Sequence, residues 1–393
     1  MSNVSKILIV VVDPHIFHFK KILKKILTGE KQYFRYEAMF NFLLARNQLA
    51  ILYTGYSTSF RRSIIKRIFL TRFFNKFEFF LWVVLNRISY RKIQFFCRIS
   101  DVDPQNSIIY DLAVGWNEDK KNYLLELSNF KGLSLINMTH YNRNSDKIFE
   151  ILPKLHYPAL ISEGNITNSR IFKLFYKDYI PEIHVPFVID HLLVDSDKYE
   201  FISDNVDSNF ENSGRKNLCL IMGSTGPHLN QKIAEITHTT SLNPDRASFR
   251  SRSIGMPYFA YAPGINNSQH NFTQTTIEEL YSEYTMFFTG LEIIQIPSMN
   301  VLEGMYFGCA YIGPDDSSHE ILGLVNNENY FAYEQGNFES FLDTVKYLID
   351  NPTLVNKVAI EGQKYVKTNF IGNKVYENFL LRVSELHRDK LKY

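Results

Sequence analysis

The chain has 393 residues, of which 45% are hydrophobic and 21% charged, so it can bury two sizeable cores. This composition excludes a disordered chain and a small scaffold that depends on disulfides or metals. The 43 lysines and arginines nearly balance the 41 aspartates and glutamates, and a net charge of +2 argues against a dedicated nucleic-acid-binding protein.

The first residues predict a buried strand rather than a secretion signal. Residues 7–12 form a short apolar run, and no small-x-small cleavage site follows it. No stretch reaches the roughly 18–20 apolar residues of a membrane span. The three cysteines are widely spaced and indicate neither a disulfide framework nor a zinc site. We therefore expect a cytoplasmic location, with membrane contact, if any, from the cytoplasmic side.

Short apolar runs alternate with helical patterns through residues 6–194. The predicted strands are 6–12, 48–53, 107–114, 133–138, 159–162 and 184–188, and the predicted helices are 36–46 and 118–128. Such alternation predicts a mostly parallel sheet with helices on both faces. Ligands of these sheets bind at the carboxyl ends of the strands, so residues that directly follow a strand are candidate site residues.

A basic and aromatic segment, residues 61–98, interrupts this pattern. It contains seven arginines and three lysines against a single acid, Glu78, with many interleaved phenylalanines. Cations and rings at helical spacing are typical of a helix on an anionic membrane surface. A helix pair that packs its rings into the first domain fits the same pattern, and a polyanionic acceptor or nucleic acid is a third explanation.

A polar stretch with six acidic residues, 195–216, predicts a linker between an N-terminal domain, 1–194, and a C-terminal domain, 217–373. Beyond it the alternation restarts. The predicted strands are 217–222, 286–289, 293–296 and 310–313, and the predicted helices are 277–284, 301–307, 338–350, 352–368 and 374–390. The last helix, within 374–393, is expected to cross back to the first domain.

The helix predicted from residue 301 has polar residues at its start. Ser298 and Asn300 lie at or near its N-terminus, where free backbone amides and a partial positive charge suit a diphosphate. Glu303, about one turn further, could accept hydrogen bonds from vicinal sugar hydroxyls. The same residues also fit an ordinary capped helix with a favourable acid in its first turn.

The first strand of the C-terminal domain ends in the sequence GSTG, in which Gly223 lets the backbone approach a ligand closely. This is neither a dinucleotide-binding fingerprint nor a Walker P-loop. Gly223, Ser224 and Thr225 are candidate donor-binding residues, and a plain strand-to-helix turn is the alternative. The candidate phosphate-binding cations are Lys232, Arg250 and Arg252.

Other candidate residues follow strands of the N-terminal domain. His140 comes after the strand 133–138, and Asp13 and His15 follow the first strand, where an acceptor could bind. Asp111 and Glu163 are further carboxylates near strand ends, and a base for an acceptor hydroxyl would come from such positions. A structural role for a lone histidine after a strand is the alternative for His140.

Three blocks within 286–370 resemble a known family: "NVLEGMYFGCAYIG", "NYFAYEQGNFESFLDTVKYLIDNP" and "IEGQKYVKTNF". They are similar to the C-terminal half of GT-B glycosyltransferases, especially the retaining, nucleotide-sugar-dependent family 4-like group and its spore-maturation-protein-like relatives. The resemblance implies an α/β, GT-B fold, with two Rossmann-like domains of parallel strands facing a central cleft.

The resemblance also implies residue roles. Glu303 matches a glutamate that binds the donor ribose, and Ser298, Met299, Asn300 and Val301 match the loop whose amides meet the diphosphate. It implies that His140 lies near the transferred sugar, and that His140 and Glu303 are the catalytic residues. A second family glutamate is replaced here by Gln295, which is a departure from the pattern.

The implied reaction transfers a sugar from a nucleoside-diphosphate sugar to a hydroxyl of a glycan or lipid-linked acceptor, with retention, in bacterial surface polysaccharide assembly. In the resembling enzymes a donor phosphate oxygen can take the proton, and neither a metal nor another cofactor is expected. The basic and aromatic segment suggests a peripheral position on the inner membrane face. A nucleotide-sugar epimerase and a non-catalytic membrane- or glycan-binding protein remain alternatives.

Overall fold

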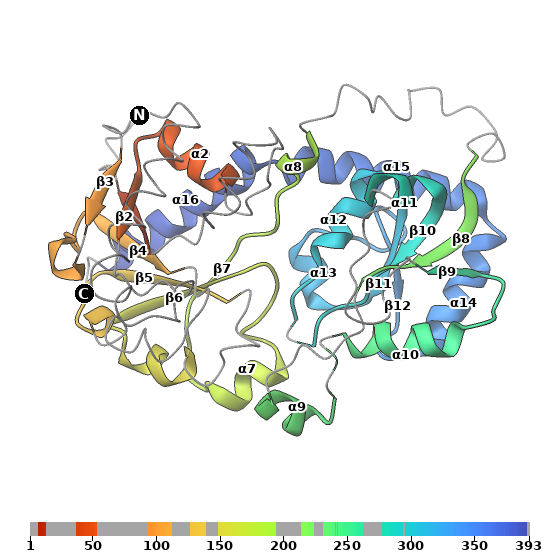
Figure 1. Cartoon of the computed structure of the whole chain (residues 1–393), viewed down its shortest axis with the longest axis horizontal. Coiled ribbons are helices and arrows are strands. Elements are labelled where there is room, and N and C mark those ends of the chain that lie inside the picture. Colours follow the sequence, from red (N-terminus) through yellow and green to blue (C-terminus); the bar gives the residue numbers. More distant parts are fainter. Residues whose placement is uncertain are drawn as a thin grey trace, which may run out of the picture. The chain divides into compact units, whose positions relative to one another are not determined.

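A computed structural model describes residues 7–12, 37–52, 93–96, 98–111, 126–138, 148–193, 214–223, 231–239, 241, 243–261, 277–293 and 295–390 (Figure 1). The chain divides into two compact units that are both discontinuous in sequence. Unit 1 comprises Met1–Ser162, Phe175–Ile183 and Tyr376–Tyr393, and unit 2 comprises Glu163–Leu174 and His184–Val375. The predicted linker lies almost wholly outside the described residues, so the predicted domain boundaries stay a prediction.

Unit 1 is built on a seven-stranded sheet with the strand order β3-β2-β1-β4-β5-β6-β7. The pairings from β3 through to β6 are parallel. The strands are β1 (Leu8–Val12), β2 (Leu49–Leu52), β3 (Gln94–Phe96), β4 (Ser107–Asp111), β5 (Leu133–Asn137), β6 (Tyr157–Ser162) and β7 (Glu182–His184). β2, β4 and β5 are buried along their whole length, as expected when helices cover both faces of a parallel sheet.

Two helices from opposite ends of the chain pack together in unit 1. Helix α2 (Glu37–Ala45) and the C-terminal helix α16 (Gly372–Lys390) meet where the rings of Phe42 and Tyr376 lie 5.9 Å apart. Further along α16, the Phe379 ring lies 5.9 Å from that of Tyr110 in β4. His387 Nε2 lies 2.8 Å from the Gln105 carbonyl oxygen. From Tyr376 on, the last helix thus belongs to the unit that contains β1.

Unit 2 contains a five-stranded parallel sheet with the order β12-β11-β10-β8-β9. Its strands are β8 (Lys216–Ile221), β9 (Phe259–Tyr261), β10 (Tyr284–Phe288), β11 (Ala310–Pro314) and β12 (Phe331–Tyr333). Its helices are α8 (Asp190–Leu193), α9 (Gln231–Thr237), α10 (Pro244–Ser253), α11 (Ile277–Glu283), α12 (Met299–Tyr306), α13 (Ser317–Ile321), α14 (Phe338–Ile349) and α15 (Pro352–Asn369). Helix α7 (Arg170–Phe175) lies at the boundary between the unit segments.

Successive side chains of each strand point to opposite faces of the unit 2 sheet, and the core divides accordingly. Leu220, Phe287 and Tyr311 pack on one face with α11 and α12. Their strand neighbours pack on the other face with α10 and α14. Gly304 allows α12 to lie close to the sheet, because a β-carbon there would be 2.4 Å from the Phe287 ring. The site-bearing helix is therefore fixed directly against β10.

Three sequence-based expectations need correction. The strand predicted at 184–188 is β7, Glu182–His184, and residues 185–188 are not part of a strand. Residues 293–296 were predicted as a strand, but their described members form part of a turn in which Gln295 has a φ of +61°. Residues 94–96, at the end of the basic and aromatic segment, form β3 on the edge of the unit 1 sheet rather than a helix. Residues 61–92 of that segment lie outside the described residues. No helix among the described residues is both long and apolar enough to cross a bilayer.

Candidate nucleotide-sugar site

The N-terminus of α12 lies at the carboxyl edge of the unit 2 sheet, because the helix links the end of β10 to the start of the parallel neighbour β11. Ser298 is the N-cap, with an extended backbone, and its Oγ accepts a hydrogen bond from the Asn300 amide at 3.4 Å. Ser298, Met299 and Asn300 are half-buried, whereas Val301 is buried. The Val301 amide donates to the Ser298 carbonyl at 3.0 Å. A first-turn amide that has no such partner can bind an anion, and at this helix start that leaves the Met299 amide as the candidate.

The loop that leads into α12 is held in place by its backbone. Leu291 and Pro297 form an antiparallel bridge, and the Glu292 amide donates to the Ile296 carbonyl at 3.3 Å. The Gln295 carbonyl accepts from the Asn165 amide and from Ser318 Oγ, both at 3.2 Å. Gln295, which replaces a glutamate of the family pattern, therefore lies in a structural turn. Its backbone carbonyl links this turn by hydrogen bonds to two other segments of unit 2.

Glu303 lies one turn into α12 and is 8% exposed. Close to this helix start, the Tyr281 hydroxyl donates to the Asn300 carbonyl at 3.1 Å. Burial raises the pKa of Tyr281 well above its usual value, and the negative charge of Glu303 raises it further. The Glu303 carboxylate and the Ser298 cap therefore lie about one helical turn apart on α12, and the nearby Tyr281 hydroxyl stays protonated.

Gly223 follows β8 and has a φ of +96°, a conformation that side chains disfavour. A β-carbon at this position would lie 2.3 Å from Nη1 of Arg246. Sequence reasoning explained this glycine by the close approach of a ligand, but in the structure the backbone approaches a guanidinium group of the chain itself. Ser224 and Thr225 lie outside the described residues.

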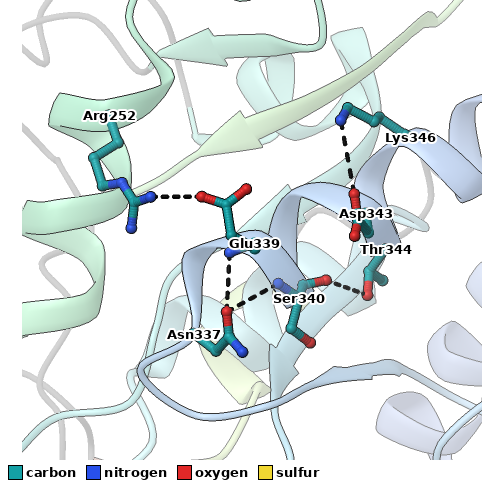
Figure 2. A network of polar contacts seen from close by, with 7 residues as sticks. All are labelled: Arg252, Asn337, Glu339, Ser340, Asp343, Thr344 and Lys346. Atoms are coloured by element: carbon teal, nitrogen blue, oxygen red, sulfur yellow. Dashed lines mark hydrogen bonds and ion pairs between the residues drawn. The ribbon is translucent and has the colours of Figure 1, made fainter.

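Arg252, a predicted donor-binding residue, lies at the C-terminal end of α10 and forms an exposed ion pair. Figure 2 shows it reaching toward Glu339 in the first turn of α14, with an Nη2–Oε1 distance of 2.6 Å. Its guanidinium carbon also lies 4.1 Å from the centre of the Phe338 ring. Arg250 faces the Tyr261 ring at 5.4 Å, and the side chain of Lys232 is not described. None of these contacts of Arg250 and Arg252 reaches α12.

The remaining candidates divide between the units. Asp111, 1% exposed, ends β4 in unit 1, and Glu163, 7% exposed, is the first unit 2 residue after β6. His140, Asp13 and His15 lie outside the described residues, so their roles stay predictions. Among the described residues no group of three or more histidine, cysteine, aspartate or glutamate side chains could hold a metal ion.

Sequence reasoning missed Arg246, the third residue of α10. It is 5% exposed, and its Nη2 donates to Thr289 Oγ1 at 2.7 Å while Nε donates to the Thr289 carbonyl. Burial lowers the pKa of Arg246 to about 10, so the group remains charged at neutral pH. The helix sequence PDRASFRSRS contains three arginines, and nothing in their spacing tells the buried one from the exposed one.

Solved structures with the same architecture cover nearly the whole chain. HepE from Anabaena, in complex with UDP and glucose, matches with a TM-score of 0.50 at 8% identity, over 96% of this chain and all of that one. The fold is that of the GT-B glycosyltransferases. A glycosyltransferase from Rickettsia africae matches with a TM-score of 0.47 at 12% identity, over 98% of this chain and 99% of that one. No protein-family model and no curated protein matches the sequence.

The GT-B assignment concerns the fold, because the identities are low. It agrees with the parallel sheets of both units and with the predicted α/β class. The predicted central cleft between two facing domains stays a prediction.

Proposed function

We propose that this GT-B chain is a glycosyltransferase that moves a sugar from a nucleoside-diphosphate sugar to a hydroxyl of a glycan or lipid-linked acceptor. The observation that carries the proposal is the Ser298-capped start of α12, half-buried at the carboxyl edge of the sheet. Ligands of open α/β sheets bind at this edge, and a diphosphate suits a helix N-terminus. The complex of the similarly folded HepE with UDP and glucose supports a nucleotide-sugar donor.

The proposed chemistry follows from charge development. As the glycosidic bond to the donor breaks, positive charge grows at the anomeric carbon and negative charge grows on the departing diphosphate. The Met299 amide, fixed at the start of α12, would stabilise the diphosphate without having to rearrange first. The amides of Asn300 and Val301 already donate to the Oγ and the carbonyl of Ser298. In this proposal Glu303 binds the ribose hydroxyls, and the reaction proceeds with retention.

A direct test replaces a single backbone amide. The Met299→Pro substitution removes the first amide of α12, and proline is tolerated there because Ser298 already has a φ of −67° and a ψ of 144°. Met299→Ala removes the same side chain but keeps the amide, and is the matched control. Since a hydrogen bond to a charged group contributes about 1.5–3 kcal/mol, we expect Met299→Pro to weaken UDP binding about 10- to 100-fold relative to Met299→Ala.

The ligand and the reaction class are tested first on the unmodified protein. A thermal-shift screen with UDP-, GDP-, ADP-, CMP- and dTDP-sugars identifies the nucleotide. Transfer to an added acceptor supports the proposal, whereas conversion of the donor sugar without an acceptor indicates an epimerase. If no nucleotide sugar binds, or if Met299→Pro and Met299→Ala bind UDP equally, the proposed site is wrong.

The membrane part of the proposal rests on the composition of residues 61–98. Flotation with neutral and anionic vesicles tests it, because cations bind anionic lipid by charge. We expect selective binding to the anionic vesicles. Equal binding to both, or binding to neither, contradicts a peripheral position on an anionic membrane and the lipid-linked acceptor that goes with it.

A further inference from the structure

The last two long helices of the chain meet at a short joint. Helix α15 ends at Asn369 and α16 begins at Gly372, with Phe370 and Ile371 between them. The boundary between unit 2 and unit 1 follows directly, after Val375, within the first turn of α16. Hinges in proteins are typically a few loop or element-terminal residues, so the joint is where α16 can turn relative to α15.

One side of the joint is anchored in the unit 2 core. Ile189 and Phe370 are both buried and belong to the same apolar cluster, which also contains side chains of α11 and α12. The Ile189 amide donates to the Phe370 carbonyl at 3.0 Å. The end of α15 is therefore fixed to the segment that leads from β7 into α8.

The other side of the joint is held by a carboxylate. The Gly372 amide, the first of α16, donates to Oδ2 of Asp190 at 2.6 Å, although the two residues are 182 positions apart. The residue before the helix, Ile371, has no side-chain acceptor, so Asp190 takes the place of an ordinary N-cap. A carboxylate at this position is favourable because the amides of a helix N-terminus carry partial positive charge.

These two hydrogen bonds differ in how readily they open. The bond to Phe370 joins two backbone groups of buried residues. The bond to Gly372 comes from the half-buried side chain of Asp190, which can rotate away without any change in the backbone. Opening of the second bond alone frees the start of α16 and leaves the end of α15 in place.

We infer that the hydrogen bond between Asp190 and Gly372 is a latch that fixes the direction of α16, and that its opening lets α16 turn at Ile371. From Tyr376 on, α16 belongs to unit 1, so the latch sets how freely the two units move relative to each other. This inference concerns the joint between the helices and does not depend on the proposed function.

The test measures the distance between two spin labels by pulsed electron paramagnetic resonance. One label replaces Leu381 in unit 1 and the other replaces Tyr347 in unit 2, because both side chains are more than half exposed. Cys97→Ser removes a further thiol, and the buried Cys219 and Cys309 are kept. A single narrow distribution indicates the latched state, and additional distances indicate the released state.

Two variants break the latch from opposite partners. Gly372→Pro removes the amide and is compatible with the first position of a helix, whereas the matched control Gly372→Ala adds a β-carbon but keeps the amide. Asp190→Ala removes the acceptor. From the strength of a hydrogen bond to a charged group, we expect Gly372→Pro and Asp190→Ala each to raise the ratio of released to latched molecules about 10- to 100-fold. Lys374→Met, which removes an exposed bond to Asn369 across the same joint, should leave the distribution unchanged.

The double variant decides whether the two changes act on one bond. Asp190→Ala combined with Gly372→Pro should release α16 no further than either change alone. Distributions like that of the unmodified protein in both single variants overturn the inference, and so does equal broadening in Gly372→Pro and Gly372→Ala. If circular dichroism shows that one single variant does not fold, the other decides, because each removes a different partner of the bond.

Discussion

The hydroxyl of Tyr311 lies 2.9 Å from Nε2 of His319, and both side chains are fully buried. The imidazole also stacks on the Tyr330 ring, with centroids 5.6 Å apart and an interplanar angle of 4°. Asp316, the N-cap of α13, and Glu320 are acidic residues on the same short helix. A histidine held in this way is a neutral hydrogen-bonding core residue, and its protonation opposes folding.

His319 should make the protein acid-sensitive. Burial lowers the pKa of His319 to about 3, below the unfolded value of about 6.5, so the unfolded state binds the extra proton between these values. Stability is therefore highest above pH 6.5 and falls as the pH drops, by about 1.4 kcal/mol per pH unit. We expect urea unfolding at pH 7 and pH 5 to show a smaller loss in His319→Phe than in the unmodified protein. The exposed His156→Asn should behave like the unmodified protein; equal losses in all three would contradict this role.

Two alanine substitutions separate the cost of a β-carbon clash at position 223 from the cost of the positive φ at that position. Gly223→Ala and Gly336→Ala both place alanine at a positive φ, but no atom lies within 4 Å of the β-carbon position at 336. A left-handed alanine costs about 1–2 kcal/mol. We expect Gly336→Ala to lose about this much free energy of unfolding, and Gly223→Ala to lose clearly more, because Arg246 must also move. Denaturant unfolding measures both losses, and equal losses would mean that the Arg246 guanidinium moves aside without an energetic cost.

Arg215 should stabilise the C-terminal end of α12. Its Nη1 donates to the Gly308 carbonyl at 2.7 Å and its Nη2 to the Phe307 carbonyl at 2.8 Å. Arg215→Met leaves these carbonyls without their charged donor, and the two lost hydrogen bonds should lower the free energy of unfolding by about 2–4 kcal/mol. Its neighbour Lys216 forms an exposed pair with Glu283, so Lys216→Met should have no measurable effect. If the unfolding curves of the two variants coincide, Arg215 does not stabilise the end of α12.

The Arg252–Glu339 pair should contribute little to stability. The side chains are 49% and 67% exposed, and pairs of this kind couple by less than about 1 kcal/mol (Figure 2). A double-mutant cycle with Arg252→Ala and Glu339→Ala measures the coupling. A coupling above about 2 kcal/mol would show that the pair is structurally important.

Asn337→Ala should cost about 1 kcal/mol of the free energy of unfolding by itself, because the Asn337 side chain caps α14 by accepting from the amides of Glu339 and Ser340.

The helix that carries the candidate site was predictable because its local signals agree. A serine at the N-cap, an apolar run from Val301 and the glycine at 308 bound α12 to within a few residues of its observed ends. The longer strands of both sheets were predictable for a similar reason, since strands buried on both faces are continuous apolar runs. The three-residue strands β3, β9 and β12 were not predicted.

The rest depends on contacts that are distant in sequence. Residues 293–296 are apolar enough for a strand, but the described part of this stretch turns at Gln295, whose carbonyl accepts from Asn165 and Ser318. Helix α10 was overlooked because its sequence is mostly polar, with Phe249 as its one large apolar residue. The burial of Arg246 follows from its contact with Thr289, 43 positions later, which no local pattern encodes.

The placement of α16 has a consequence for synthesis. Tyr376, Phe379 and His387 complete the packing of unit 1 against residues that precede them by more than 260 positions. These residues are translated after the last residue of unit 2, Val375, so unit 1 stays unfinished while unit 2 is already available to fold. Nascent chains stalled before residue 376 should therefore expose the unit 1 sheet to chaperones, even though its strands are translated before those of unit 2.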